Sequence, residues 1–123
     1  MKSKSFNFIL QCWIVDEIET IIVDQDNCKL IQDRLDREPS LDLYETVFHK
    51  VIDNFDCFTK DQFANYFCQK IVDQADDLKI SMIVDKLSDQ IVEISKNSHG
   101  TRVLQKVIEK VLYHLIKWTQ PSV

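Results

Sequence analysis

The sequence predicts an all-helical protein built from stacked repeats. Only one glycine and two prolines occur among 123 residues, so the turn residues that β-sandwiches, phosphate-binding loops and flexible linkers need are scarce. Hydrophobic residues make up 45% of the chain, which is enough for a real core. Apolar residues recur at helical spacing, and the glutamines at 32, 69 and 105 lie 37 and 36 residues apart in similar surroundings.

At the N-terminus we expect a helix that caps the stack, over residues 1–16. Lysines precede a mostly apolar stretch there, as in a secretory signal. Asn7 and Gln11 interrupt the stretch, however, and acidic residues follow it without a small-residue cleavage site. No run in the chain approaches the roughly 20 apolar residues of a membrane span.

Three segments align without gaps and define the repeats. Each opens a helix, and further amphipathic stretches at 41–52, 78–87 and 91–95 give each unit two or three helices. A unit of this size cannot bury its apolar stripe alone, so neighbouring units must stack around a continuous core. We assign the repeats to residues 17–52, 53–88 and 89–123, with an apolar helix at the end of the last. The aligned segments are Asp26–Gln32, Phe63–Gln69 and His99–Gln105.

The charge is uneven along the chain. The formal net charge is −5, which by itself argues against a nucleic-acid partner. Residues 96–123, however, carry five basic groups and one acidic group. A polyanion is therefore expected to prefer the C-terminal end of the protein.

The polar residue types argue against an enzyme and against a metal site. The cysteines form no C-x-x-C pair and the three histidines are far apart, so no metal-ligand spacing is present and no cofactor is expected. The sequence contains no recognisable Ser-His-Asp or Cys-His catalytic motif. His99 is interpreted as marking the start of a helix and not as a catalytic base. We interpret the cysteines as reduced thiols of a reducing compartment. They are Cys12, Cys28, Cys57 and Cys68.

Each repeat carries one set of polar residues that share a helix face. The first, second and fifth residues of a set fall at about 0°, 100° and 40° around the helix axis. A glutamine or asparagine amide offers donors and an acceptor, which suits a nucleobase edge, and tyrosine or arginine stacks on bases. The pattern favours single-stranded RNA; the alternatives are a solvated surface and a helical scaffold that binds a protein partner. The sets are Cys28, Lys29 and Gln32; Asn65, Tyr66 and Gln69; and Thr101, Arg102 and Gln105.

These sets lie in segments that resemble the Pumilio (PUF) family of RNA-binding repeat proteins. Asp61–Ile71 resembles the family's D-x-F-G-N-Y-x-x-Q-K helix, and Ile94–Lys106 resembles I-S-x-N-x-H-G-T-R-x-x-Q-K. Asp24–Gln32 is similar to the D-Q-x-G-C-R-x-x-Q of a first repeat. The resemblance covers residues 17–110 and implies a right-handed α-solenoid of three-helix repeats, each of which binds one base.

The resemblance also implies a role for each set. Base-edge contacts fall to Cys28 and Gln32 for adenine, Asn65 and Gln69 for uracil, and Thr101 and Gln105 for adenine, while Lys29, Tyr66 and Arg102 stack. Because RNA runs antiparallel to the repeats in this family, the implied site is A-U-A from 5′ to 3′. The implied role is post-transcriptional regulation of messenger RNA in the cytoplasm, through sites in 3′ untranslated regions.

Several residues depart from the family pattern. Lys29 stands where arginine or an aromatic residue usually stacks, and an ammonium group has no plane for stacking. Asp33 replaces the lysine that follows the glutamine in the other repeats. Family members usually stack eight repeats, and residues 111–118 are apolar where the end of a solenoid needs a polar cap. We therefore expect either a fragment or an end that meets a protein partner or a second copy.

Overall fold

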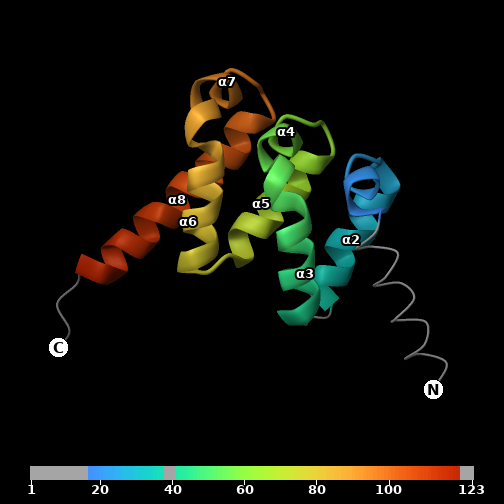
Figure 1. Ribbon diagram of the computed structural model, residues 1–123, viewed down its shortest axis with the longest axis horizontal. Helices are drawn as coiled ribbons and strands as arrows, with labels where there is room; N and C mark the ends of the chain where they lie inside the picture. The colour runs from blue at the N-terminus through green and yellow to red at the C-terminus, as the bar shows by residue number, and fades with distance from the viewer. Residues whose placement is uncertain (1–16, 38–40, 120–123) are drawn as a thin grey trace.

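A computed structural model describes residues 17–37 and 41–119, and within these residues the chain is helical without a β-strand (Figure 1). Residues 17–21 are helical, and the predicted cap over residues 1–16 lies outside the described ranges. The helices that follow are α2 (Gln25–Arg37), α3 (Leu41–Val51), η1 (Ile52–Asn54), α4 (Phe55–Thr59), α5 (Ala64–Gln74), α6 (Asp77–Leu87), η2 (Ser88–Gln90), α7 (Ile91–Ser95) and α8 (Gly100–Thr119). None of these helices is long and apolar enough to cross a membrane.

The helices form a solenoid in which equivalent elements stand side by side. α5 packs against both α2 and α8. The short helices α4 and α7 precede α5 and α8 and lie along the same edge of the solenoid, at the top of Figure 1. We call α2, α5 and α8 the reading helices, because each carries one of the three polar sets. The predicted helical repeat architecture is confirmed.

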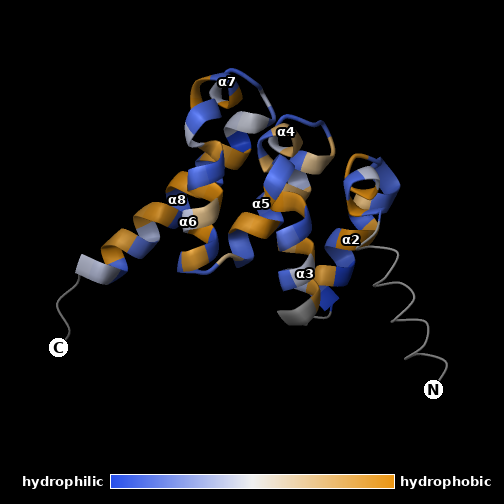
Figure 2. Ribbon diagram, viewed as in Figure 1, coloured by the Kyte–Doolittle hydropathy of each residue, from blue (hydrophilic) through white to orange (hydrophobic). Residues whose placement is uncertain are grey.

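One apolar core runs through the stack, from Ile18 before the first reading helix to Val107 in α8. Phe48, Phe55 and Phe67 are fully enclosed and come from three different helices. Along most helices, hydrophobic and hydrophilic residues alternate in short stretches (Figure 2), as expected for helices that bury one side and expose the other. Because the core is continuous, the apolar side of each repeat is buried only when the neighbouring repeat packs against it.

The same side-chain cap starts every reading helix. Asp61 Oδ2 accepts hydrogen bonds from the backbone N–H groups of Phe63 and Ala64, at 2.9 and 2.8 Å. Asn97 Oδ1 accepts in the same way from His99 and Gly100, both at 2.9 Å. Before α2, Asp24 Oδ2 accepts from the backbone N–H of Asn27 at 3.0 Å. Because these oxygens satisfy N–H groups that the first helical turn leaves free, they fix where each reading helix begins.

The third repeat differs from the second in how its reading helix ends. α5 stops where Ala75 adopts an extended conformation, and Asp76 then caps α6 by accepting from the backbone N–H of Lys79 at 2.9 Å. The equivalent residues of the third repeat are Val111 and Leu112, neither of which can cap a helix. α8 therefore continues without a break to Thr119.

The cap at Asp76 predicts a measurable effect on stability. Replacing Asp76→Ala removes the acceptor for the first turn of α6, and we expect the free energy of unfolding to fall by about 1 kcal/mol in urea titrations at pH 7. Asp85→Ala, at an exposed position of the same helix, is the matched control and should change it by less than about 0.5 kcal/mol.

The effect of this substitution should also depend on pH. The hydrogen bond from the backbone of Lys79, together with its ammonium group, lowers the pKa of the Asp76 carboxyl from its ordinary value of 3.8. The stabilisation is therefore complete above that ordinary value and is lost as the pH falls through the lowered one. A difference between wild type and Asp76→Ala that persisted undiminished in strong acid would contradict the assignment.

Candidate functional site

The structure brings the three polar sets onto three adjacent reading helices. Each set lies in the first two turns of its helix, directly after the cap. Of the three glutamines, Gln32 and Gln69 are half-buried and Gln105 is exposed, so none of them is sealed inside the core. The second residue of each set, Lys29, Tyr66 or Arg102, is exposed.

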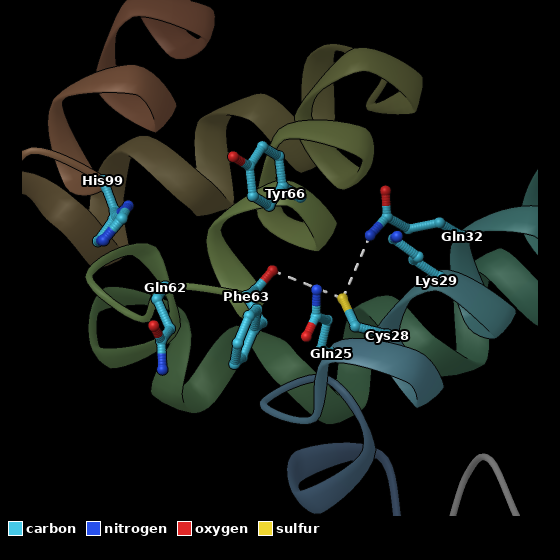
Figure 3. Close-up of a pocket in the computed structure, with 8 residues that line it drawn as sticks. All are labelled: Gln25, Cys28, Lys29, Gln32, Gln62, Phe63, Tyr66 and His99. Atoms are coloured by element: carbon cyan, nitrogen blue, oxygen red, sulfur yellow. Dashed lines mark hydrogen bonds between the residues drawn. The ribbon is translucent and has the colours of Figure 1, made fainter.

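In the first set, Cys28 and Gln32 are joined to each other and to the next repeat. Gln32 Nε2 donates to Cys28 Sγ at 3.2 Å, and Cys28 Sγ donates to the backbone oxygen of Phe63 at 3.5 Å (Figure 3). Burial raises the pKa of the Cys28 thiol, so it remains protonated at neutral pH. The position of Gln32 thus depends on a contact that crosses from α2 to the residue before α5.

In the second set, Asn65 orients Gln69. Asn65 is fully buried, and its Nδ2 donates to the backbone oxygens of Asp61 and Gln62 at 2.8 and 3.0 Å. Its Oδ1 accepts from Gln69 Nε2 at 3.1 Å. Both Asn65 N–H groups are therefore engaged. Gln69 retains its Oε1 and one N–H, for which no hydrogen bond is found within the described residues.

The third set lacks such support in the part of the chain that the structure describes. Thr101 is exposed where Cys28 and Asn65 are buried, and no hydrogen bond joins its side chain to Gln105 there. Part of the difference follows from residue type, because threonine has no amide to make the bonds that Asn65 makes within its own repeat.

A cavity of about 510 Å³ opens between the first and second reading helices (Figure 3). Cys28 and Gln32 of the first set and Tyr66 of the second set line it, and His99 reaches it from the third repeat. Its lining residues are Gln25, Cys28, Lys29, Gln32, Gln62, Phe63, Tyr66 and His99.

Sequence reasoning missed several of these lining residues. Gln25 and Gln62 occupy the same position of their repeats, 37 residues apart, so the repeat alignment could have indicated them. His99 was expected only to mark a helix start, and it reaches the cavity from the third repeat. No sequence spacing predicts that contact, since it depends on how closely the repeats stack.

Ion pairs link successive reading helices and occupy two of the lysines on this face. Lys70 Nζ lies 2.6 Å from Asp36 Oδ2, and Lys106 Nζ lies 2.9 Å from Asp73 Oδ2. The lysine of one repeat thus pairs with the acid of the preceding repeat, in the same register both times. Because both ammonium groups already pair with carboxylates, they are less available to the phosphates of a nucleic acid.

The side chains around the cavity offer hydrogen-bond donors, acceptors and one exposed ring to a ligand. They include amides, a neutral thiol, a hydroxyl group and a tyrosine ring that is 49% exposed. Cys28, Cys57 and Cys68 are free thiols, while Cys12 lies outside the described residues. Within those residues no group of three potential metal ligands occurs.

Comparison with known proteins connects this chain to a family. A family model described as the Pumilio-family RNA binding repeat matches residues 54–88 and 90–112. A Pumilio domain-containing protein of Schizosaccharomyces pombe is 33% identical over 72% of this chain, and Pumilio homolog 11 of Arabidopsis thaliana is 35% identical over 72%. The chain spans only 13% and 16% of the lengths of these relatives.

Solved structures show the same similarity. The Puf4 RNA binding domain, bound to the HO endonuclease RNA 3′ UTR recognition sequence, superposes with a TM-score of 0.68 and 33% identity over 73% of this chain and 28% of its own. The RNA-binding domain of yeast Puf5p bound to MFA2 RNA gives a TM-score of 0.70 and 26% identity over 74% of this chain and 25% of its own.

The role of Asn65 can be tested through stability. Asn65→Ala removes a fully buried amide that donates to the backbone oxygens of Asp61 and Gln62, so the free energy of unfolding should fall by about 1–3 kcal/mol in urea titrations. Thr101→Ala is the matched control, because it changes the equivalent position in α8, where the side chain is exposed. Its effect should stay within about 0.5 kcal/mol. Equal decreases in the free energy of unfolding for both variants would show that the hydrogen bonds of Asn65 do not stabilise the fold.

Proposed function

Since the chain belongs to the Pumilio family of repeat proteins, we propose that it binds single-stranded RNA along the face formed by α2, α5 and α8. The observation that carries this proposal is the cavity between the first two reading helices, which combines edge-reading amides with an exposed aromatic ring. An unpaired base has a flat face for stacking and a polar edge for hydrogen bonds, and this lining offers a partner to each.

We assign one base to each repeat. In the first repeat Gln32 and Cys28 face the base edge, and Tyr66 of the next repeat lines the same cavity as Lys29. A base held there has the tyrosine ring available for stacking, which compensates for the missing plane of the ammonium group. The strength of the first position therefore depends on a residue of the second repeat.

The base identities follow from the family resemblance. We propose adenine for the set of Cys28 and Gln32, uracil for Asn65 and Gln69, and adenine for Thr101 and Gln105, which gives A-U-A from 5′ to 3′. In the second set the Gln69 amide is directed at the base, and Asn65 fixes which end of that amide faces outward by accepting one of its N–H groups at 3.1 Å. Arg102 stacks in the third repeat.

The affinity of these repeats should come from bases more than from phosphates. Stacking on a side chain contributes about 1–3 kcal/mol per base, and part of this is offset by the cost of ordering the strand. Lys70 and Lys106 are already paired with carboxylates. We therefore propose binding on the order of micromolar or weaker, with a shallow dependence on salt.

The biological consequence that we propose is regulation of messenger RNA after transcription. Binding to 3′ untranslated regions would bring the protein to transcripts whose stability or translation it controls. This role and a cytoplasmic location rest on the family resemblance alone.

Tyr66→Ala tests the stacking contribution. Loss of the ring should weaken binding to a fluorescently labelled oligonucleotide that ends in A-U-A by roughly tenfold or more, measured by anisotropy. Tyr113→Ala is the matched control, since Tyr113 is 61% exposed on α8 and lies outside the cavity lining. A dissociation constant that Tyr66→Ala leaves unchanged would remove the stacking assignment.

A double substitution tests the edge contacts. Asn65→Ser combined with Gln69→Glu places a carboxylate opposite the base, and a carboxylate accepts hydrogen bonds from the ring N–H and the exocyclic amine of guanine. We expect the preference to shift from A-U-A towards A-G-A when both oligonucleotides are titrated against both proteins. Continued preference for uracil in the double variant would show that these residues do not contact the base edge.

A further inference from the structure

Three polar side chains line the cavity between the reading helices without belonging to any of the three polar sets. Gln25 is the first residue of α2, while Gln62 and His99 lie just before α5 and α8. Figure 3 shows Gln62 and His99 on one side of the cavity and Gln32 on the other. We call Gln25, Gln62 and His99 the rim of the cavity. The rim takes one residue from each repeat, so it crosses the stack in the direction in which a strand with one base per repeat runs.

The backbone at the rim is fixed by the hydrogen bonds that start the reading helices. Asn65 Nδ2 donates to the backbone oxygen of Gln62 at 3.0 Å. Asn97 Oδ1 accepts from the backbone N–H of His99 at 2.9 Å. Both rim side chains therefore project from an ordered main chain, which lowers the cost of ordering them around a ligand.

The rim side chains have hydrogen-bonding groups without partners. Among the described residues, no hydrogen bond or ion pair involves the side chain of Gln25, Gln62 or His99. The two glutamines are exposed and the histidine is half-buried. An amide offers two N–H donors and an acceptor, and a neutral imidazole offers one donor and one acceptor. The rim is therefore suited to a ligand group that both donates and accepts.

Carboxylates beside the rim make it unfavourable for a phosphate. Asp61 and Asp24 accept hydrogen bonds from the backbone N–H groups that start α5 and α2. Burial is the main reason that the pKa of the Cys28 thiol is raised, and the nearby charges of Asp61 and Asp24 raise it further. The helix N-termini that would otherwise attract an anion are thus already occupied by carboxylates. A neutral polar group is tolerated there, whereas a phosphate is repelled.

We propose that the rim binds the ribose 2′-hydroxyl groups of the RNA strand and thereby distinguishes RNA from DNA. This inference rests on the proposed binding of single-stranded RNA along the reading helices, and it adds the sugar to the contacts assigned there. A 2′-hydroxyl is neutral and both donates and accepts hydrogen bonds, so it matches the side chains of the rim. With a base held between Gln32 and Tyr66 in the same cavity, the sugars are the neutral polar groups of the strand that remain for the rim.

The position of the rim glutamines recurs with the period of the polar sets. Gln25, Gln62 and Ser98 each stand three residues before the first residue of a set. All three side chains end in a neutral group that donates and accepts hydrogen bonds. His99 occupies the next position and brings a second such group to the third repeat. This recurrence is expected for a contact that is made to a group present in every nucleotide.

A pair of oligonucleotides with identical bases tests the proposal. The first is RNA that ends in A-U-A, and the second is its 2′-deoxy counterpart, in which deoxyuridine keeps the uracil base. By fluorescence anisotropy the wild type should bind the RNA roughly tenfold more tightly, because the deoxy strand leaves the rim without partners. Gln62→Ala should weaken RNA binding roughly threefold to tenfold and leave the affinity for the deoxy strand unchanged.

Gln74→Ala is the matched control for Gln62→Ala. Gln74 is an exposed glutamine at the end of α5 and lies outside the cavity lining. Its replacement should leave the affinity for both oligonucleotides unchanged. Because Gln62 and Gln74 are both exposed, thermal melting should show an intact fold for each variant.

Two substitutions of His99 separate its hydrogen bonds from its bulk. His99→Ala should reduce the preference for RNA, whereas His99→Gln retains a donor and an acceptor and should keep it. Equal losses of affinity for the RNA and the deoxy strand in Gln62→Ala and His99→Ala would place these contacts on phosphates or bases and overturn the inference.

The wild-type measurement distinguishes this inference from the proposed function. Equal affinity of the wild type for the two oligonucleotides would overturn the inference, while binding of single strands along the reading helices would stand. Absence of binding to both oligonucleotides would overturn the proposed function, and the inference with it.

Discussion

The structure depends on the inability of a single repeat to cover its own apolar surface. A unit of this length has a helix with one side that only a neighbour can bury. Phe67 and Val72 in the middle repeat are both fully buried, whereas their equivalents at the two ends of the described stack, Leu30 in α2 and Ile108 in α8, are 61% and 58% exposed. Stacking is therefore the condition for folding, and it also sets the distance at which the polar sets of adjacent repeats stand.

The same stacking gives the candidate binding residues their geometry. Gln32 is held by Cys28, which in turn reaches the backbone of the next repeat, and Gln69 is held by the buried Asn65. The side chains that face outward are thus ordered by contacts made below the surface. A site of this type is preorganised, because little rotamer freedom remains to be lost when a ligand arrives.

Much of the fold was predictable from local pattern, and much of the site was not. Helical periodicity predicted the helices, and the glutamines that recur 37 and 36 residues apart predicted their repetition, since both signals can be read directly from the order of residues. The ion pairs Asp36–Lys70 and Asp73–Lys106 join residues more than thirty positions apart, and the contact of His99 with the cavity depends on the stacking distance. The uninterrupted α8 follows from the missing cap at Leu112, which alignment with Asp76 could have revealed. The assignment of bases to the three sets remains a prediction.

The alternation of acid and lysine along the stack restricts how such a gene can be rearranged. Duplicating the second repeat in tandem would set Lys70 of the new copy against Asp73 of the old one, so the insertion would preserve a matched junction. Moving the first repeat to the interior would instead set Asp33 against another acid. The acid and the lysine at each junction therefore favour one order of the repeats. Tandem duplication of the second repeat keeps opposite charges together, whereas an internal copy of the first repeat does not.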